Sequence, residues 1–202
     1  MPRLLLIRHA PTAATGTVLT GRLPGVALDA AGREIAETLA GALADTPLTA
    51  VYTSPVLRCR QTARAVARPH GLSPVALGSL AEVDYGEWAG RTLKSLARTK
   101  LWESVLRAPS RVRFPGGETL REVQVRSVTA CEEIALRHPR GTIAVVSHGD
   151  VIKSIVAHYL GTPLDLFQRI RVQPASVSVL EVPRTGPPGV IAVNRLADGA
   201  LS

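Results

Sequence analysis

The chain has 202 residues, a length that suits one domain with a substantial core. Apolar residues make up 46% of it in short runs, which excludes a disordered chain, and no run approaches the roughly 18 residues of a membrane-spanning helix. The net charge is +8, but the basic residues are scattered and aromatic residues are only 3%, so the sequence argues against nucleic acid as a partner.

The beginning of the chain lacks the pattern of a secretory signal, because its apolar run, residues 4–7, is short and is followed by a charge. We therefore expect a cytoplasmic protein with no membrane partner. Its two cysteines, Cys59 and Cys131, are too few for a disulfide framework and lack metal-ligand spacing. We expect both to be reduced and at least partly buried.

The first quarter of the chain predicts two strands that flank a long loop and a helix. Residues 4–7 are typical of a buried strand, and residues 10–28 have no helical period and predict a long loop of the kind that is often functional. Asp29 is a good N-cap for a helix that runs to about residue 43. Residues 48–52 predict the second strand.

The next segment begins with a helix signal and then becomes irregular. Ser54 and Pro55 predict the N-cap and the first residue of a helix that ends near residues 69–71. The expectations that follow are, in chain order, a short strand at 74–77, an irregular acidic segment at 80–90, a helix within 92–107 and a turn at 114–118.

The remaining elements continue the alternation of helix and strand. They are a helix at 119–137, a strand at 142–146, a helix at 150–160, a short helical piece at 164–169, and strands at 176–182 and 190–194. The alternation predicts an α/β fold: a three-layer α/β/α sandwich with a mostly parallel central sheet, helices on both faces and an antiparallel strand near the C-terminus. No repeat or linker divides the sequence, so we expect a single domain over residues 1–202.

Two predicted strands end in a histidine, at His9 and at His148. In a parallel α/β sheet both would lie at the carboxyl edge, where ligands bind. A third strand ends just before Ser54, and Arg58 falls in the first turn of the helix that follows, whose free N–H groups favour an anion. Together with Arg8, these side chains are expected to line one pocket that suits a phosphate. Arginine makes bidentate contacts to phosphate oxygens, and a neutral imidazole can attack phosphorus.

These residues lie in motifs that resemble those of the histidine phosphatase (phosphoglycerate mutase-like) superfamily. Residues 8–12, Arg-His-Ala-Pro-Thr, resemble its Arg-His-Gly-x-Ser/Thr signature. Five further blocks match in order along nearly the whole chain: 20–22 (Thr-Gly-Arg), 53–62 (with Ser-Pro-x-x-Arg-x-x-Gln-Thr), 80–90, 115–119 and 146–149. Six ordered blocks are a specific signal, which the first block alone would not be.

The resemblance implies a role for each matching residue. His9 would form the phosphohistidine, and Arg8, Arg58 and His148 would complete the phosphate pocket. Glu82 would be the general acid that protonates the leaving alcohol and then activates water, with Asp84 and Glu87 as its acidic rivals nearby. The implied substrate-binding residues are Thr12, Thr15, Thr20, Gly21, Arg22 and Gly149.

Two positions depart from the pattern of the superfamily. Ala10 stands in place of the usual glycine, so the backbone there must adopt ordinary dihedral angles. Thr15 stands where an asparagine often contacts the phosphate, and threonine has a shorter reach and no amide N–H.

Three functions are compatible with this pattern. The first is hydrolysis of a small phosphate monoester through a phosphohistidine; the second is a phosphomutase reaction; the third is a non-catalytic protein that binds phosphate or nucleic acid. Residues 91–114 lack the longer insertion and motif of the mutases, which favours the phosphatase, although residues 150–176 resemble a subgroup labelled as phosphomutases. We expect no metal and no cofactor, because arginines and His148 supply the positive charge. An exposed sheet edge would suit a homodimer.

Overall fold

The computed structural model describes residues 1–197 and contains one six-stranded sheet. The strands are β1 (Pro2–Arg8), β2 (Leu48–Thr53), β3 (Val75–Ala76), β4 (Gly141–Ser147), β5 (Val177–Glu181) and β6 (Gly189–Arg195), in the order β3-β2-β4-β1-β5-β6. The pairings β1–β4, β2–β4 and β2–β3 are parallel, whereas β1–β5 and β5–β6 are antiparallel. The predicted mostly parallel sheet with antiparallel pairing near the C-terminus is therefore confirmed.

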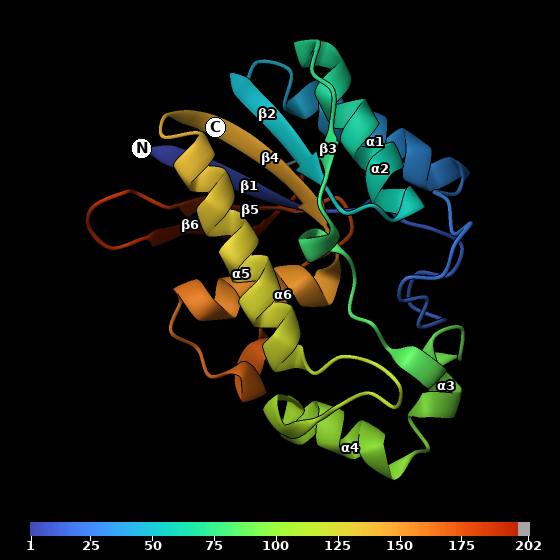
Figure 1. Ribbon diagram of the computed structural model, residues 1–202. Helices are drawn as coiled ribbons and strands as arrows, with labels where there is room; N and C mark the ends of the chain where they lie inside the picture. Colours follow the sequence, from blue (N-terminus) through green and yellow to red (C-terminus); the bar gives the residue numbers. More distant parts are fainter. Residues whose placement is uncertain (198–202) are drawn as a thin grey trace.

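Four helices cover the two faces of this sheet (Figure 1): α1 (Ala30–Ala42), α2 (Leu57–Ala67), α5 (Leu120–Arg137) and α6 (Gly149–Tyr159). The short helices α3 (Leu93–Leu96) and α4 (Lys100–Arg107) lie apart from the sheet (Figure 1). The pair α1 and α2 packs on one face and the pair α5 and α6 on the other, as the two hydrophobic clusters show. The three-layer α/β/α architecture is thus the one that the sequence predicts.

The central strand β1 shows why the apolar runs of the sequence are continuous and do not alternate with polar residues. Leu4 and Leu6 belong to the cluster under α5 and α6, whereas Leu5 and Ile7 belong to the cluster under α1 and α2. A strand buried on both faces needs apolar side chains at every position. Because β1 and β4 are both of this kind and run parallel, their carboxyl ends emerge side by side at one edge of the sheet.

Side-chain caps open two of the helices, and the sequence predicts the first of these caps, Asp29. Asp29 Oδ1 accepts a hydrogen bond from the Gly32 N–H at 2.7 Å and opens α1. Thr119 and Glu122 form a reciprocal capping box at the start of α5, which satisfies backbone N–H groups that have no partner inside the helix.

The predicted beginning of α2 is wrong. This helix starts at Leu57 with Val56 as its N-cap, rather than at Ser54 and Pro55. The Ser54 hydroxyl lies 2.8 Å from His148 Nε2 and accepts a hydrogen bond from the Val56 N–H, so a tertiary contact fixes this side chain in the connection that precedes the helix.

The segment 92–107 also differs from the expected single helix. It forms the short helices α3 and α4, and Thr99 caps the second by accepting a hydrogen bond from the Trp102 N–H. Within residues 1–197, no helix is long and apolar enough to cross a membrane.

Candidate active site

Two histidines meet where β1 and β4 end. Arg8 and Ser147 are paired in register, so His9 and His148 follow at the same edge of the sheet. The His9 N–H donates to the Ser147 carbonyl at 3.0 Å, and the imidazole centroids are 5.3 Å apart. The predicted juxtaposition of the two strand-end histidines is therefore present.

The His9 ring is held in one tautomer. Its Nδ1 lies 2.8 Å from the Ala10 carbonyl oxygen, which can only accept, so Nδ1 carries the proton. Nε2 therefore has a lone pair, which accepts a hydrogen bond from Arg58 Nε at 3.1 Å. Burial, followed by the charge of Arg58, lowers the pKa of His9 to about 3, with a smaller lowering from Arg8. At neutral pH this imidazole is therefore uncharged and has a fixed orientation.

The two arginines near His9 are incompletely hydrogen-bonded; Arg58 is buried and Arg8 is half-buried. Arg58 is 1% exposed, donates from Nη2 to the Gly21 carbonyl at 2.9 Å, and has no partner for Nη1 among the described residues. Arg8 donates from Nη1 to the Val172 carbonyl at 2.7 Å, and its buried Nε also lacks a partner in residues 1–197. Leaving a buried donor unpaired is costly, so an anion in the adjoining cavity would be strongly favoured.

His148 is fully buried behind these groups. Its Nε2 lies 2.8 Å from Ser54 Oγ, and its Nδ1 lies 3.1 Å from Arg58 Nη2 and 3.6 Å from Glu82 Oε2. Burial, and then the Arg58 charge, hold the pKa of His148 well below its usual value. The Cys59 thiol packs 3.4 Å from His148 Nε2, and burial raises its pKa, so it is a buried reduced cysteine as the sequence predicts.

Glu82 is the acidic side chain of its loop that reaches the cavity. Its Oε1 accepts a hydrogen bond from the Val83 N–H at 2.9 Å. Burial, and then the negative charge of Asp150, raise the pKa of Glu82 to about 7. The rivals Asp84 and Glu87 do not line the cavity, and Asp84 instead accepts a hydrogen bond from the Gly86 N–H.

Of the five residues predicted to be catalytic, Arg8, His9, Arg58 and Glu82 line a cavity of about 230 Å³. His148 does not line it, because its ring is fully buried against Arg58. Five of the six residues assigned to substrate binding line it: Thr12, Thr15, Thr20, Gly21 and Gly149. The sixth, Arg22, does not. Its Nε donates to the Glu82 carbonyl at 2.8 Å, and its Nη2 forms an ion pair with Glu118 at 2.8 Å. Arg22 thus braces the loop that carries the acidic residue.

The two departures from the superfamily pattern are accommodated locally. Ala10 is buried and is not among the described non-glycine residues with positive φ, so an ordinary backbone conformation suffices there. Thr15 Oγ1 accepts a hydrogen bond from the Thr12 N–H at 2.9 Å. The threonine thus orders the loop at the cavity wall.

Sequence reasoning missed three polar residues of the cavity, Tyr85, Asp150 and Lys153. The Tyr85 hydroxyl donates to Asp150 Oδ2 at 2.9 Å, and Lys153 Nζ donates to Asp150 Oδ1 at 3.2 Å. A signal for two of them was present, because Asp150 and Lys153 fall near the start of the helix that follows His148, one turn apart. The placement of Tyr85 could not be read from local sequence.

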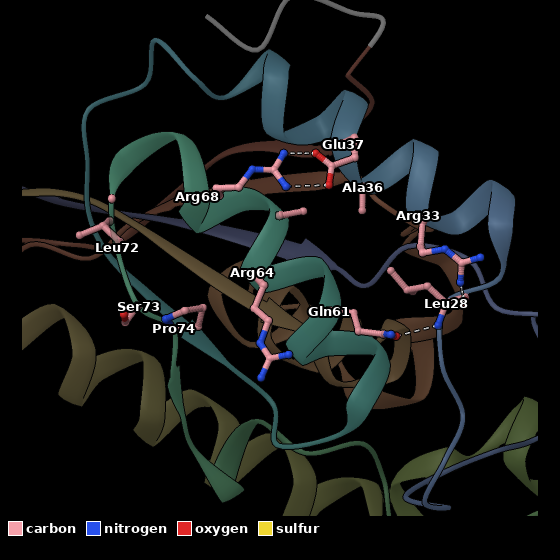
Figure 2. A pocket seen from close by; sticks show the side chains of 12 residues that line it. Leu28, Arg33, Ala36, Glu37, Gln61, Arg64, Arg68, Leu72, Ser73 and Pro74 are labelled. Atoms are coloured by element: carbon pink, nitrogen blue, oxygen red, sulfur yellow. Dashed lines mark hydrogen bonds and ion pairs between the residues drawn. The ribbon is translucent and has the colours of Figure 1, made fainter.

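A larger hollow of about 650 Å³ lies between α1 and α2, away from this chemistry (Figure 2). Its charged lining consists of Arg33, Arg64, Arg68 and Glu37, and the last two form an ion pair across the two helices. Its lining contains no histidine or cysteine that could act as a nucleophile. The larger of the two cavities is therefore not the one that contains the candidate catalytic residues. Within residues 1–197, no three His, Cys, Asp or Glu side chains gather as a metal-binding set.

Fold and site together define a phosphoryl-transfer enzyme of the histidine type. Residues 4–194 match the model of the histidine phosphatase superfamily (branch 1), and the chain belongs to this superfamily. It is a phosphoric monoester hydrolase of that class, which uses a histidine rather than a metal ion.

Known proteins resemble the chain over nearly its whole length. Phosphoserine phosphatase 1 of Hydrogenobacter thermophilus is 31% identical over 188 residues, which are 90% of this chain and 87% of that protein. A bifunctional protein of Mycobacterium tuberculosis is 30% identical over 196 residues, and the chain spans only 54% of it. The solved structure of Bacillus stearothermophilus YhfR superposes with a TM-score of 0.88 at 28% identity, covering 95% of this chain and 96% of that one.

Proposed function

We propose that the chain hydrolyses small phosphate monoesters with His9 as the nucleophile and Glu82 as the proton donor. The observation that carries this assignment is the fixed tautomer of His9, whose Nε2 lone pair faces Arg58. Arg58 and Arg8, which line the same cavity, each have a buried N–H group without a partner in residues 1–197. A neutral nucleophile facing unused cationic donors suits attack on a dianionic phosphate ester.

The phosphate would take the unpaired donors of Arg8 and Arg58. It would also be within reach of the N-terminal N–H groups of α6, because Gly149 opens this helix and lines the cavity. Gly149 further leaves room for Arg8, since a Cβ atom at position 149 would lie 3.3 Å from the Arg8 guanidinium carbon. His148 Nδ1 lies 3.1 Å from Arg58 Nη2 and would help to hold the Arg58 guanidinium toward the same oxygens.

In the first step, the His9 Nε2 lone pair forms a bond to phosphorus while the bond from phosphorus to the ester oxygen breaks. Glu82 gives its proton to that oxygen, so that an alcohol departs instead of an alkoxide. A carboxyl group with a pKa near 7 still carries a proton at neutral pH and can therefore do this.

In the second step, the ionised Glu82 takes a proton from water as the water oxygen attacks the phosphorus of phospho-His9. The bond from phosphorus to Nε2 breaks, inorganic phosphate is released, and both side chains regain their starting states. Positive charge from Arg8 and Arg58 stabilises the equatorial oxygens in both steps.

The test is phosphate release from p-nitrophenyl phosphate by the intact chain and by His9→Ala. We expect the variant to lose more than about 10⁴-fold in kcat, because it removes the nucleophile, and to form no acid-labile phosphoprotein. His158→Ala, at an exposed position on α6, is the matched control and keeps full activity.

Two results would contradict the assignment. A wild-type chain that neither releases phosphate nor forms a phosphoprotein would exclude both enzymatic readings. Transfer of label from phospho-His9 to a second sugar phosphate, without net release of phosphate, would assign the phosphomutase reaction instead. The small ester as partner, the cytoplasmic location, the single domain over residues 1–202 and the homodimer remain our predictions.

A further inference from the structure

The cavity wall holds one cation and one anion in direct contact, in addition to the groups assigned to the phosphate. Lys153 Nζ and Asp150 Oδ1 are 3.2 Å apart, and both residues line the cavity. Their side chains are 19% and 26% exposed. The mechanism proposed above uses neither of them as a reacting group, although both lie within the first five residues of α6, the helix that Gly149 opens.

Other side chains hold this pair in place. The Tyr85 hydroxyl donates to the second oxygen of Asp150, and burial raises the pKa of Tyr85 well above its usual value, so it remains a donor. Lys153 also donates to Gln168 Oε1 at 3.1 Å, and its ammonium lies 5.6 Å from the centre of the Phe167 ring. The two charges are therefore fixed in the wall before a ligand arrives, which lowers the entropic cost of binding.

The pair has unused hydrogen-bonding capacity. An ammonium group has three donors, and Lys153 uses two of them within the described residues. A carboxylate offers about four acceptor sites, and Asp150 uses two. A ligand with only a carboxylate would be attracted by Lys153 and repelled by Asp150. A ligand with only an ammonium group would be attracted by Asp150 and repelled by Lys153. A ligand with both charges on neighbouring atoms satisfies both residues.

We propose that Asp150 and Lys153 form a subsite for the ammonium and carboxylate groups of a short phosphorylated α-amino acid. Lys153 binds the carboxylate and Asp150 binds the ammonium group, while the phosphate lies at His9. The cavity volume of about 230 Å³ is below the ~300–1,000 Å³ of typical drug-sized ligand pockets, which restricts the substrate to a short side chain. This inference rests on the proposed phosphatase function and names the substrate class for it.

Three commercial esters test the two halves of the subsite separately. O-phospho-L-serine carries both groups, phosphoethanolamine lacks the carboxylate, and 3-phosphoglycerate has a hydroxyl group in place of the ammonium group. The measurement is kcat/KM for each, with p-nitrophenyl phosphate as a general substrate. We expect phosphoserine to exceed each of the other two by about 10- to 100-fold, since each loses one charge-assisted interaction.

Two variants should remove these preferences independently. Lys153→Met should reduce the ratio of phosphoserine to phosphoethanolamine towards one, and Asp150→Asn should do so for the ratio of phosphoserine to 3-phosphoglycerate. Ratios are compared because a change at Asp150 that alters proton donation by Glu82 affects all three esters together. Lys100→Met and Asp45→Asn, at exposed positions outside the cavity, are the matched controls and should leave both ratios unchanged.

The outcomes separate this inference from the function on which it rests. If p-nitrophenyl phosphate is hydrolysed but the three esters react within about threefold of one another, the subsite is refuted and the phosphatase stands. The same conclusion follows if neither ratio changes in the variants. If no ester is hydrolysed, including p-nitrophenyl phosphate, the proposed phosphatase function itself fails.

Discussion

Replacement of Glu82 by glutamine removes the proposed proton donor and nearly preserves its size. Burial and the charge of Asp150 raise the pKa of this carboxyl group from 4.5 to about 7. At pH 7 about half of the molecules therefore carry the proton, compared with about one in 300 for a carboxyl group of pKa 4.5. The environment of Glu82 thus increases the competent fraction by about 160-fold at neutral pH.

The sign of the pH dependence follows from the two groups that must react. The first step needs His9 without its second proton, so activity rises as pH increases through about 3. It needs Glu82 with its proton, so activity falls as pH increases through about 7. We expect a bell-shaped profile of kcat/KM, which reports the free enzyme in the step that forms the phosphohistidine.

The assay compares an alkyl phosphate with p-nitrophenyl phosphate across the pH range. Glu82→Gln should lower kcat/KM for the alkyl ester by about 10²–10⁴-fold, because an alkoxide leaves poorly without a proton. The loss should be smaller for p-nitrophenyl phosphate, whose leaving group needs less protonation. The variant should also lose the upper limb of the profile, since glutamine does not titrate.

The substrate provides an internal control, because a phosphate ester has its own pKa near 6. A limb that comes from the substrate persists in Glu82→Gln, and a limb that comes from the enzyme disappears. The reasoning is refuted if the variant keeps the wild-type profile, or if both esters lose activity equally. Either result would move the proton donor to another residue.

Two further substitutions test how the site is held together, and His9→Ala tests the nucleophile as described above. Arg22→Met should lower kcat/KM for alkyl phosphates more than for p-nitrophenyl phosphate, because the Arg22 guanidinium holds the Glu82 backbone carbonyl and does not line the cavity. Equal losses for both esters would indicate that Arg22 binds the substrate directly. Gly149→Ala should raise KM about tenfold, since the new Cβ atom would lie 3.3 Å from the Arg8 guanidinium. Gly41→Ala is the control: it lies within α1, its Cβ atom would have no neighbour inside 4 Å, and it should raise Tm in a thermal melt while leaving KM unchanged. If KM is also unchanged in Gly149→Ala, the Arg8 side chain moves away from the new methyl group and the prediction is wrong.

Local sequence carried enough information for the layers and for most of the helices. Continuous apolar runs such as residues 4–7 favour strands that are buried on both faces, and the alternation of such runs with helical segments predicts a sheet covered by helices. Caps at Asp29 and Thr119 mark helix starts because they satisfy backbone groups nearby in the chain. The cap expected at Ser54 is absent, since its hydroxyl is bound to His148, 94 residues away.

By itself the sequence determined which chemistry is available: histidines at two strand ends, arginines next to them and a carboxyl group in an acidic loop. The family resemblance favoured Glu82 within that loop, but the sequence did not determine which nitrogen of His9 carries the proton, or what turns Glu82 rather than Asp84 toward the cavity. Those facts depend on contacts between distant segments, such as the brace from Arg22 to the Glu82 carbonyl. The pKa values depend on them too, because burial and neighbouring charges are properties of the assembled core and not of any short stretch of chain.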